Sequence, residues 1–81
     1  MSEWTNIEGS HTSQKASFKK IIDEVLDGED IVGFYQHREF SVRFEHGGIR
    51  AAKSIQKIID TFKEFDKSAN ISLVATIPFS A

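Results

Sequence analysis

A long amphipathic segment, from Ile49 to about Phe65, constrains the fold more than any other feature of the sequence. Its apolar side chains recur at steps of three and four residues, the spacing of one face of a helix with a period of about 3.6 residues. That face consists of Ala52, Ile55, Ile58, Ile59, Phe62 and Phe65. Gly47 and Gly48 interrupt the chain just before the segment. A helix of this kind needs an apolar surface to lie on, so the remainder of the chain must supply one.

A second, shorter helix is predicted over residues Gln14 to Asp27. Its apolar stripe is made of Phe18, Ile21, Ile22, Val25 and Leu26. Gly28 follows directly, and glycine commonly ends a helix by adopting a left-handed conformation. The hydroxyl groups in the polar stretch Gly9–Ser13, which is predicted to be a loop, are natural N-caps for this helix.

Four segments are predicted to be strands: Trp4–Gly9, Ile31–Tyr35, Phe40–Glu45 and Ile71–Ile77. The third alternates apolar Phe40, Val42 and Phe44 with polar Ser41, Arg43 and Glu45. The fourth has Ile71, Leu73, Ala75 and Ile77 on one face, and Ser72, Val74 and Thr76 on the other. Such alternation is typical of a sheet with one buried and one solvated face. Pro78 cannot donate to a ladder and marks the end of the last strand.

The predicted order is therefore β-α-β-β-α-β within a single domain of residues 1–81. Two helices that are each apolar on one side can share one face of a four-stranded antiparallel sheet. This is the α+β, ferredoxin-like (split βαβ) two-layer sandwich. Right-handed crossovers place the first and third strands in its centre. Many unrelated functions occur on this fold, so the function must come from a site.

Composition narrows the classes of function. The formal net charge is −2, whereas a phosphate-binding domain usually has an excess of lysine and arginine. The absence of cysteine excludes disulfides and thiolate metal sites. The N-terminal sequence does not have the pattern of a signal peptide, and no apolar run approaches the roughly 20 residues of a membrane span. The sequence thus predicts a cytoplasmic protein without membrane attachment, of a size compatible with a phage or mobile-element origin.

No catalytic or metal-binding constellation is apparent, so neither an enzyme nor a cofactor or metal is predicted. His11, His37 and His46 are predicted to be solvent-exposed loop residues, with His11 and His37 at the same end of the sheet. An RNA-binding sheet of this fold would carry exposed aromatic residues on its central strands, and the third strand lacks them. Tyr35, Ile31 and Trp4 are the residues that could reach the open face.

The sequence therefore favours a small non-enzymatic module that binds another protein, or a second copy of itself, as an inhibitor or adaptor. The predicted contact residues on the open face are Tyr35, Arg43, Glu45, Val74 and Thr76. One alternative is nucleic-acid binding through basic helix faces that carry Arg50, Lys53 and Lys57. A further alternative is a small-anion site at a loop–helix junction, such as His46–Gly48 with Arg50 and Lys53.

Overall fold

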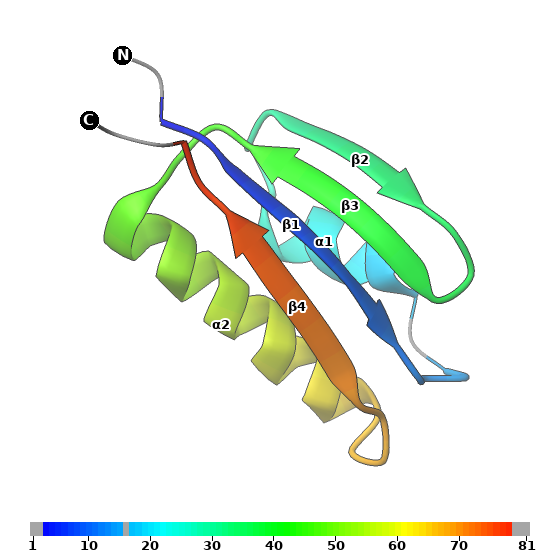
Figure 1. The fold of residues 1–81 in the computed structure, drawn as a ribbon. Helices are drawn as coiled ribbons and strands as arrows, with labels where there is room; N and C mark the ends of the chain where they lie inside the picture. The colour runs from blue at the N-terminus through cyan, green and yellow to red at the C-terminus, as the bar shows by residue number, and fades with distance from the viewer. Residues whose placement is uncertain (1–2, 16, 79–81) are drawn as a thin grey trace.

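The computed structural model describes residues 3–15 and 17–78 and has the predicted α+β, ferredoxin-like fold. The elements follow in the order β1 (Thr5–His11), α1 (Phe18–Val25), β2 (Ile31–Tyr35), β3 (Glu39–Phe44), α2 (Gly48–Phe65) and β4 (Ile71–Thr76). The strands form one antiparallel sheet in the order β2-β3-β1-β4, with β1 and β3 in the centre as predicted. Both helices lie on the same face of this sheet (Figure 1).

The core forms between the helices and one face of the sheet. The predicted stripe of α1 is confirmed, since Phe18, Ile21, Ile22 and Leu26 are buried and Val25 packs against them. The predicted alternation in β3 is confirmed as well: Phe40, Val42 and Phe44 are buried, whereas Arg43 is exposed. Helix α2 contributes Ala51, Ile58 and Phe62, and β1 contributes Ile7.

The buried face of α2 differs from the predicted one at two positions. Ala51 is buried and Ala52 is exposed, because Ala51 is aligned with Ile58 and Phe62 while Ala52 lies about 100° further around the helix. Phe65, in the last turn, is 54% exposed. An 18-residue helix is about 27 Å long, whereas a six-residue strand spans about 20 Å, so the sheet cannot cover the whole helix.

Strand β1 continues two residues beyond its predicted end, so the prediction of a loop from Gly9 was wrong. Gly9 is paired with Phe40 of β3 and Leu73 of β4, inside the sheet. A Cβ atom at this position would collide with the backbone oxygen of Ser72. Glycine is therefore required here for the close approach of β4 and does not terminate the strand.

Helix α1 begins at Phe18, four residues later than predicted, because the preceding segment is held by the turn between α2 and β4. The Ser13 hydroxyl donates a hydrogen bond of 2.9 Å to Asp66, and the Asn70 amide donates one of 2.7 Å to the Thr12 hydroxyl. Beyond the helix, Gly28 has a φ of 82°, which confirms the predicted left-handed conformation. The hydroxyl groups expected to cap the helix thus fix a loop.

Candidate binding face of the sheet

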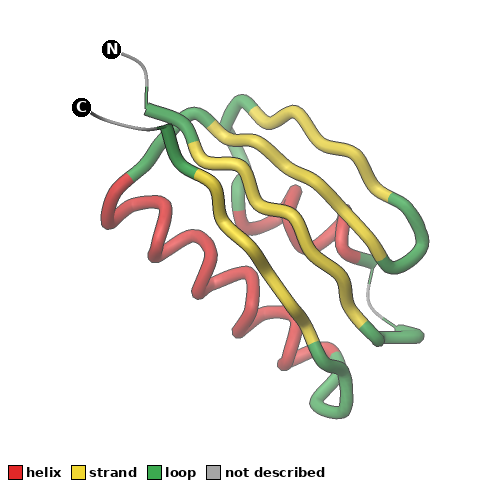
Figure 2. The backbone as a smooth tube through the Cα atoms, in the orientation of Figure 1, coloured by secondary structure: helices red, strands yellow, loops and turns green. Residues whose placement is uncertain are grey.

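One face of the sheet is not covered by either helix. In Figure 2, no helix or loop of the described residues crosses in front of the strands. Residues opposite each other on antiparallel neighbours share a face, so the strand register gives the rows of this surface. They are Val32–Arg43–Asn6–Thr76, Phe34–Ser41–Glu8–Val74 and Glu39–Ser10–Ser72. We call this surface the open face.

The assignment of Tyr35 to the open face was wrong. Tyr35 is paired with buried Phe40 and packs against the core, and Ile31 is likewise paired with buried Phe44. Burial, together with the nearby Asp23 carboxylate, raises the pKa of Tyr35 to about 12. Strand β2 is apolar at both alternating sets of positions, so its sequence could not show which set faces the helices.

The exposed apolar residues of this surface are Val32 and Phe34 on β2 and Val74 on β4. They are 73%, 58% and 64% exposed, respectively. Val74 was predicted from the alternation in β4, but Val32 and Phe34 were not. The signal that could have identified them is the pairing of β2 with β3, which requires Phe34 to lie opposite Ser41. The open face therefore has an apolar residue near each outer edge.

Arg43 lies on the open face, as predicted, and Glu45, predicted there as well, is exposed just beyond the end of β3. The Arg43 guanidinium is 4.9 Å from the centre of the Trp4 ring and also contacts the Glu45 carboxylate at 3.2 Å. Trp4 therefore reaches the open face, where its ring makes a cation–π contact with the Arg43 guanidinium. Thr76, which was also predicted here, is exposed in the same row as Arg43.

A shallow hollow of about 300 Å³ lies next to Phe34. It is lined by Glu8, Gly9, Ser10, Phe34, Glu39, Phe40 and Ser41. Its two ionisable side chains are the carboxylates of Glu8 and Glu39, so it suits a cationic or amphipathic group of a partner.

The basic residues Arg50, Lys53 and Lys57 belong to α2 and therefore to the other layer of the molecule. The structure does not bring them together with the open face. Arg50 is paired with the carboxylate of Glu29, and the other oxygen of that carboxylate is 3.4 Å from Nδ1 of His46. The predicted anion site at His46–Gly48 thus already contains a carboxylate of the same chain.

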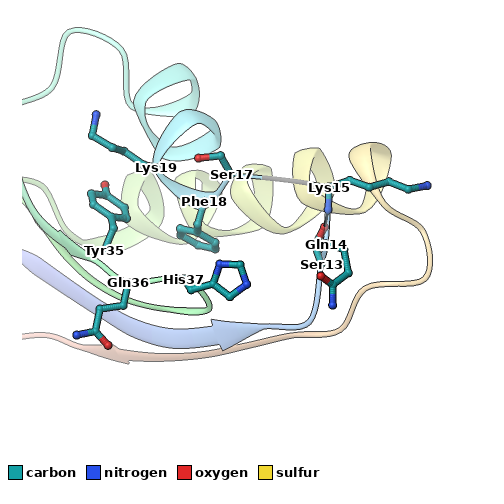
Figure 3. A pocket seen from close by; sticks show the side chains of 9 residues that line it. All are labelled: Ser13, Gln14, Lys15, Ser17, Phe18, Lys19, Tyr35, Gln36 and His37. Atoms are coloured by element: carbon teal, nitrogen blue, oxygen red, sulfur yellow. Dashed lines mark hydrogen bonds between the residues drawn. The ribbon is translucent and has the colours of Figure 1, made fainter.

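A second hollow, of about 320 Å³, lies at the beginning of α1. Its lining includes Lys15, Ser17, Lys19, Tyr35 and His37. Figure 3 shows the Lys15 side chain directed away from the other lining residues, and the Lys19 ammonium is 2.9 Å from the Asp23 carboxylate. The two lysines therefore do not converge on one point, as a tight anion site would require.

The prediction of solvent-exposed histidines holds for His37 alone. His11 is buried with its ring 4.9 Å from that of Phe62, and its Nδ1 accepts a hydrogen bond from the Ser13 amide. Burial lowers the pKa of His11, and the nearby His37 and Arg38 lower it further, which fits their predicted placement at one end of the sheet. His46 is buried against Phe44 and hydrogen bonds to Ser54.

Among the described residues, no group of three or more His, Asp or Glu side chains could hold a metal ion. Neither helix in this part of the chain has the length and apolar character that crossing a membrane requires.

No protein-family model and no curated protein matches the chain. The chain is similar in structure to the de novo designed protein Foldit4, with a TM-score of 0.65 and 13% identity over 95% of this chain and 99% of that one. It is also similar to LFR1 1, a de novo designed protein with a ferredoxin fold, with a TM-score of 0.54 and 20% identity over 95% of this chain and 86% of that one.

A part of a hydantoinase/carbamoylase family amidase from Burkholderia ambifaria is similar as well. Its TM-score is 0.50 at 6% identity, and the match covers 96% of this chain but 27% of the amidase. At such low identities these similarities establish the ferredoxin-like fold and carry no function.

Proposed function

We propose that this chain is a small, non-enzymatic protein-binding module of the cytoplasm that acts as an inhibitor or adaptor through its open face. The observation that carries the proposal is the exposure of Val32, Phe34 and Val74 on a sheet face that neither α1 nor α2 covers. Val32 and Phe34 are neighbours on the same face of β2, and exposed apolar residues bordered by polar ones are typical of protein interaction sites.

The partner that fits this face presents apolar side chains together with at least one lysine or arginine. Phe34 is the aromatic anchor, because its ring is exposed beside the hollow and aromatic rings that become buried in an interface contribute much of its affinity. The neighbouring carboxylates of Glu8 and Glu39 would attract a basic side chain into the hollow beside that ring.

The same residues argue against the nucleic-acid alternative on this face. The open-face positions of the central strands are Asn6, Glu8 and Ser10 on β1, and Glu39, Ser41 and Arg43 on β3. An RNA-binding sheet stacks bases on aromatic residues at such positions, and carboxylates repel phosphate.

The test compares two phenylalanines of similar exposure. Phe34 on the open face is 58% exposed, and Phe65 on α2 is 54% exposed. Phe34→Ser and Phe65→Ser would be purified, and their melting temperatures compared to confirm that both are folded. Proteins captured from the source cells by the unchanged chain would then be identified, purified and titrated against all three by calorimetry.

We expect Phe34→Ser to weaken binding by about tenfold or more, which corresponds to roughly 1.4 kcal/mol, and Phe65→Ser to leave it unchanged. Equal losses in both variants would contradict the proposal. Salt-sensitive binding of DNA or RNA that Lys53→Glu weakens would support the nucleic-acid alternative instead. A rise in melting temperature with inorganic phosphate alone would support the anion alternative.

A further inference from the structure

Strand β4 is an edge of the sheet without the usual protection against pairing. Within the described residues, β4 pairs with β1 and with no other strand. The seven residues from Ile71 to Ile77 include no charged residue and no proline, and Pro78 follows only at the end. Natural proteins usually protect exposed edges with lysines, prolines, bulges or very short strands. An unprotected edge of this length can add a further strand.

The helix layer also leaves this edge uncovered. Ala75 is paired with buried Ile7 and therefore lies on the helix side of the sheet, yet it is exposed. Ile77, two residues further along, is 64% exposed, and Ile49 in the first turn of α2 is 77% exposed. Apolar surface thus remains open on both layers at the same side of the molecule.

One flank of helix α2 has three apolar residues and one glutamine. Ile49, Ala52, Gln56 and Ile59 follow one another at steps of three, four and three residues, the spacing of a helix–helix seam. Ser54, on the opposite flank, hydrogen bonds to His46 and so lies on the side of the helix layer that includes Glu29. Figure 1 shows α2 on the β4 side of the helix layer.

We propose that a second copy of this chain pairs with β4, forming a two-fold symmetric dimer with an eight-stranded sheet. In an antiparallel pair, residues that lie opposite each other have their side chains on the same face of the sheet. When β4 pairs with the partner's β4 around a two-fold axis, this condition is met only if one residue lies opposite its own copy, so the axis passes beside that residue. An axis at Val74 pairs the whole edge from Ile71 to Ile77. It places Ile71 opposite the partner's Ile77, Ser72 opposite the partner's Thr76, Leu73 opposite the partner's Ala75, and Val74 opposite the partner's Val74.

Every pair in this register is compatible in character: Ile–Ile and Leu–Ala on the helix side, and Ser–Thr and Val–Val on the open face. The same symmetry brings the two α2 seams together in antiparallel orientation. Lys53 borders the seam in the first half of α2, and Asp60, which accepts a hydrogen bond from Gln56, borders it in the second half. Antiparallel seams therefore place the basic half of one helix against the acidic half of the other. Both layers of the molecule are therefore complementary to a second copy in the same arrangement.

The other edge strand, β2, is less suited to this pairing. It has five residues, with Gly33 at its centre, and a central glycine weakens a strand and has no side chain to pack. The ring of Tyr35 lies directly against the Gly33 position. We therefore assign the dimer to β4 and make pairing through β2 one of the outcomes of the test.

The first experiment measures molar mass by light scattering on a size-exclusion column, from micromolar to millimolar concentration. We expect the chain to approach twice its 9.1 kDa mass as concentration rises. Ala75→Lys, which introduces a charge into two symmetric pairs, should remain monomeric. Val32→Lys, at the exposed position of β2, is the matched control and should dimerise as the unchanged chain does. Circular dichroism would confirm folding, and Ile49→Lys is a second disrupting variant should Ala75→Lys fail to fold.

The register has its own test, because the chain contains no cysteine. Under mild oxidation Val74→Cys should form a disulfide with itself, since the two copies of this residue are directly opposed. Ser72→Cys and Thr76→Cys should each crosslink poorly alone but well when mixed. A monomer at every concentration would overturn the proposal, as would loss of the dimer in Val32→Lys but not in Ala75→Lys. Phe34→Ser should retain the dimer, because Phe34 lies on β2 at the opposite edge of the sheet, so the dimer can be tested separately from partner binding at Phe34.

Discussion

Phe62 and Phe65 offer the sharpest check on the core, because the sequence assigns both to one apolar face and the structure separates them. Phe62 is fully buried, with its ring 4.9 Å from that of His11 and 5.6 Å from that of Phe18. Phe62→Ala removes this packing and leaves a cavity, which costs about 3–5 kcal/mol. A domain of 81 residues has a free energy of unfolding of roughly 4–12 kcal/mol, so the variant should lose a large fraction of its stability.

Phe65→Ala should have a much smaller effect. Phe65 is 54% exposed, so less than half of the roughly 1.5–3 kcal/mol from burying a phenylalanine is at stake, about 1 kcal/mol. The higher helix propensity of alanine offsets part of that loss. Urea titrations followed by circular dichroism give both free energies of unfolding. A loss for Phe65→Ala as large as that for Phe62→Ala would refute the placement of α2 on the sheet.

Three further predictions concern single residues. Because the folded-state pKa of His11 is lowered, its contribution to stability is present above pH 6.5 and is lost as the pH falls through the folded-state value. In urea titrations between pH 7.5 and 5, the free energy of unfolding should therefore fall more steeply for the unchanged chain than for His11→Asn. The asparagine amide oxygen can replace Nδ1 as the hydrogen-bond acceptor. Equal slopes for the two proteins would contradict this prediction.

Tyr35 is the only tyrosine of the sequence, so absorbance near 295 nm reports on its ionisation. The titration of the folded protein should have its midpoint at about pH 12. A midpoint near 10 would mean that the Tyr35 ring is not buried. Gly9→Ala should destabilise the protein and weaken amide protection in β4 more than in β2, because the new methyl group meets the backbone of Ser72. Hydrogen exchange measures this difference, and unchanged protection in β4 would argue against the close approach.

The sequence alone determined the order of elements and the topology. The apolar residues of α1 and α2 recur at steps of three and four, and those of β3 at every second position, so each element has one face that can be buried. The order β-α-β-β-α-β with right-handed crossovers then leads to one simple arrangement of the four strands. Arg43, Glu45, Val74 and Thr76 could be placed on the exposed side for the same reason, since their strands alternate clearly between apolar and polar residues.

Only the tertiary structure decided the features that depend on which strand lies next to which. Strand β2 is apolar on both faces, so pairing with β3 was needed to place Tyr35 inside and Phe34 outside. Gly9 resembles a strand end until β4 is placed beside it. His11 is buried because the ring of Phe62, from a distant segment of the chain, packs against it. His46 is buried against the nearby Phe44, and its more distant neighbours are Ser54 and Glu29. Local patterns record the environment of a residue along its own element, whereas these environments are made by neighbours that are remote in sequence.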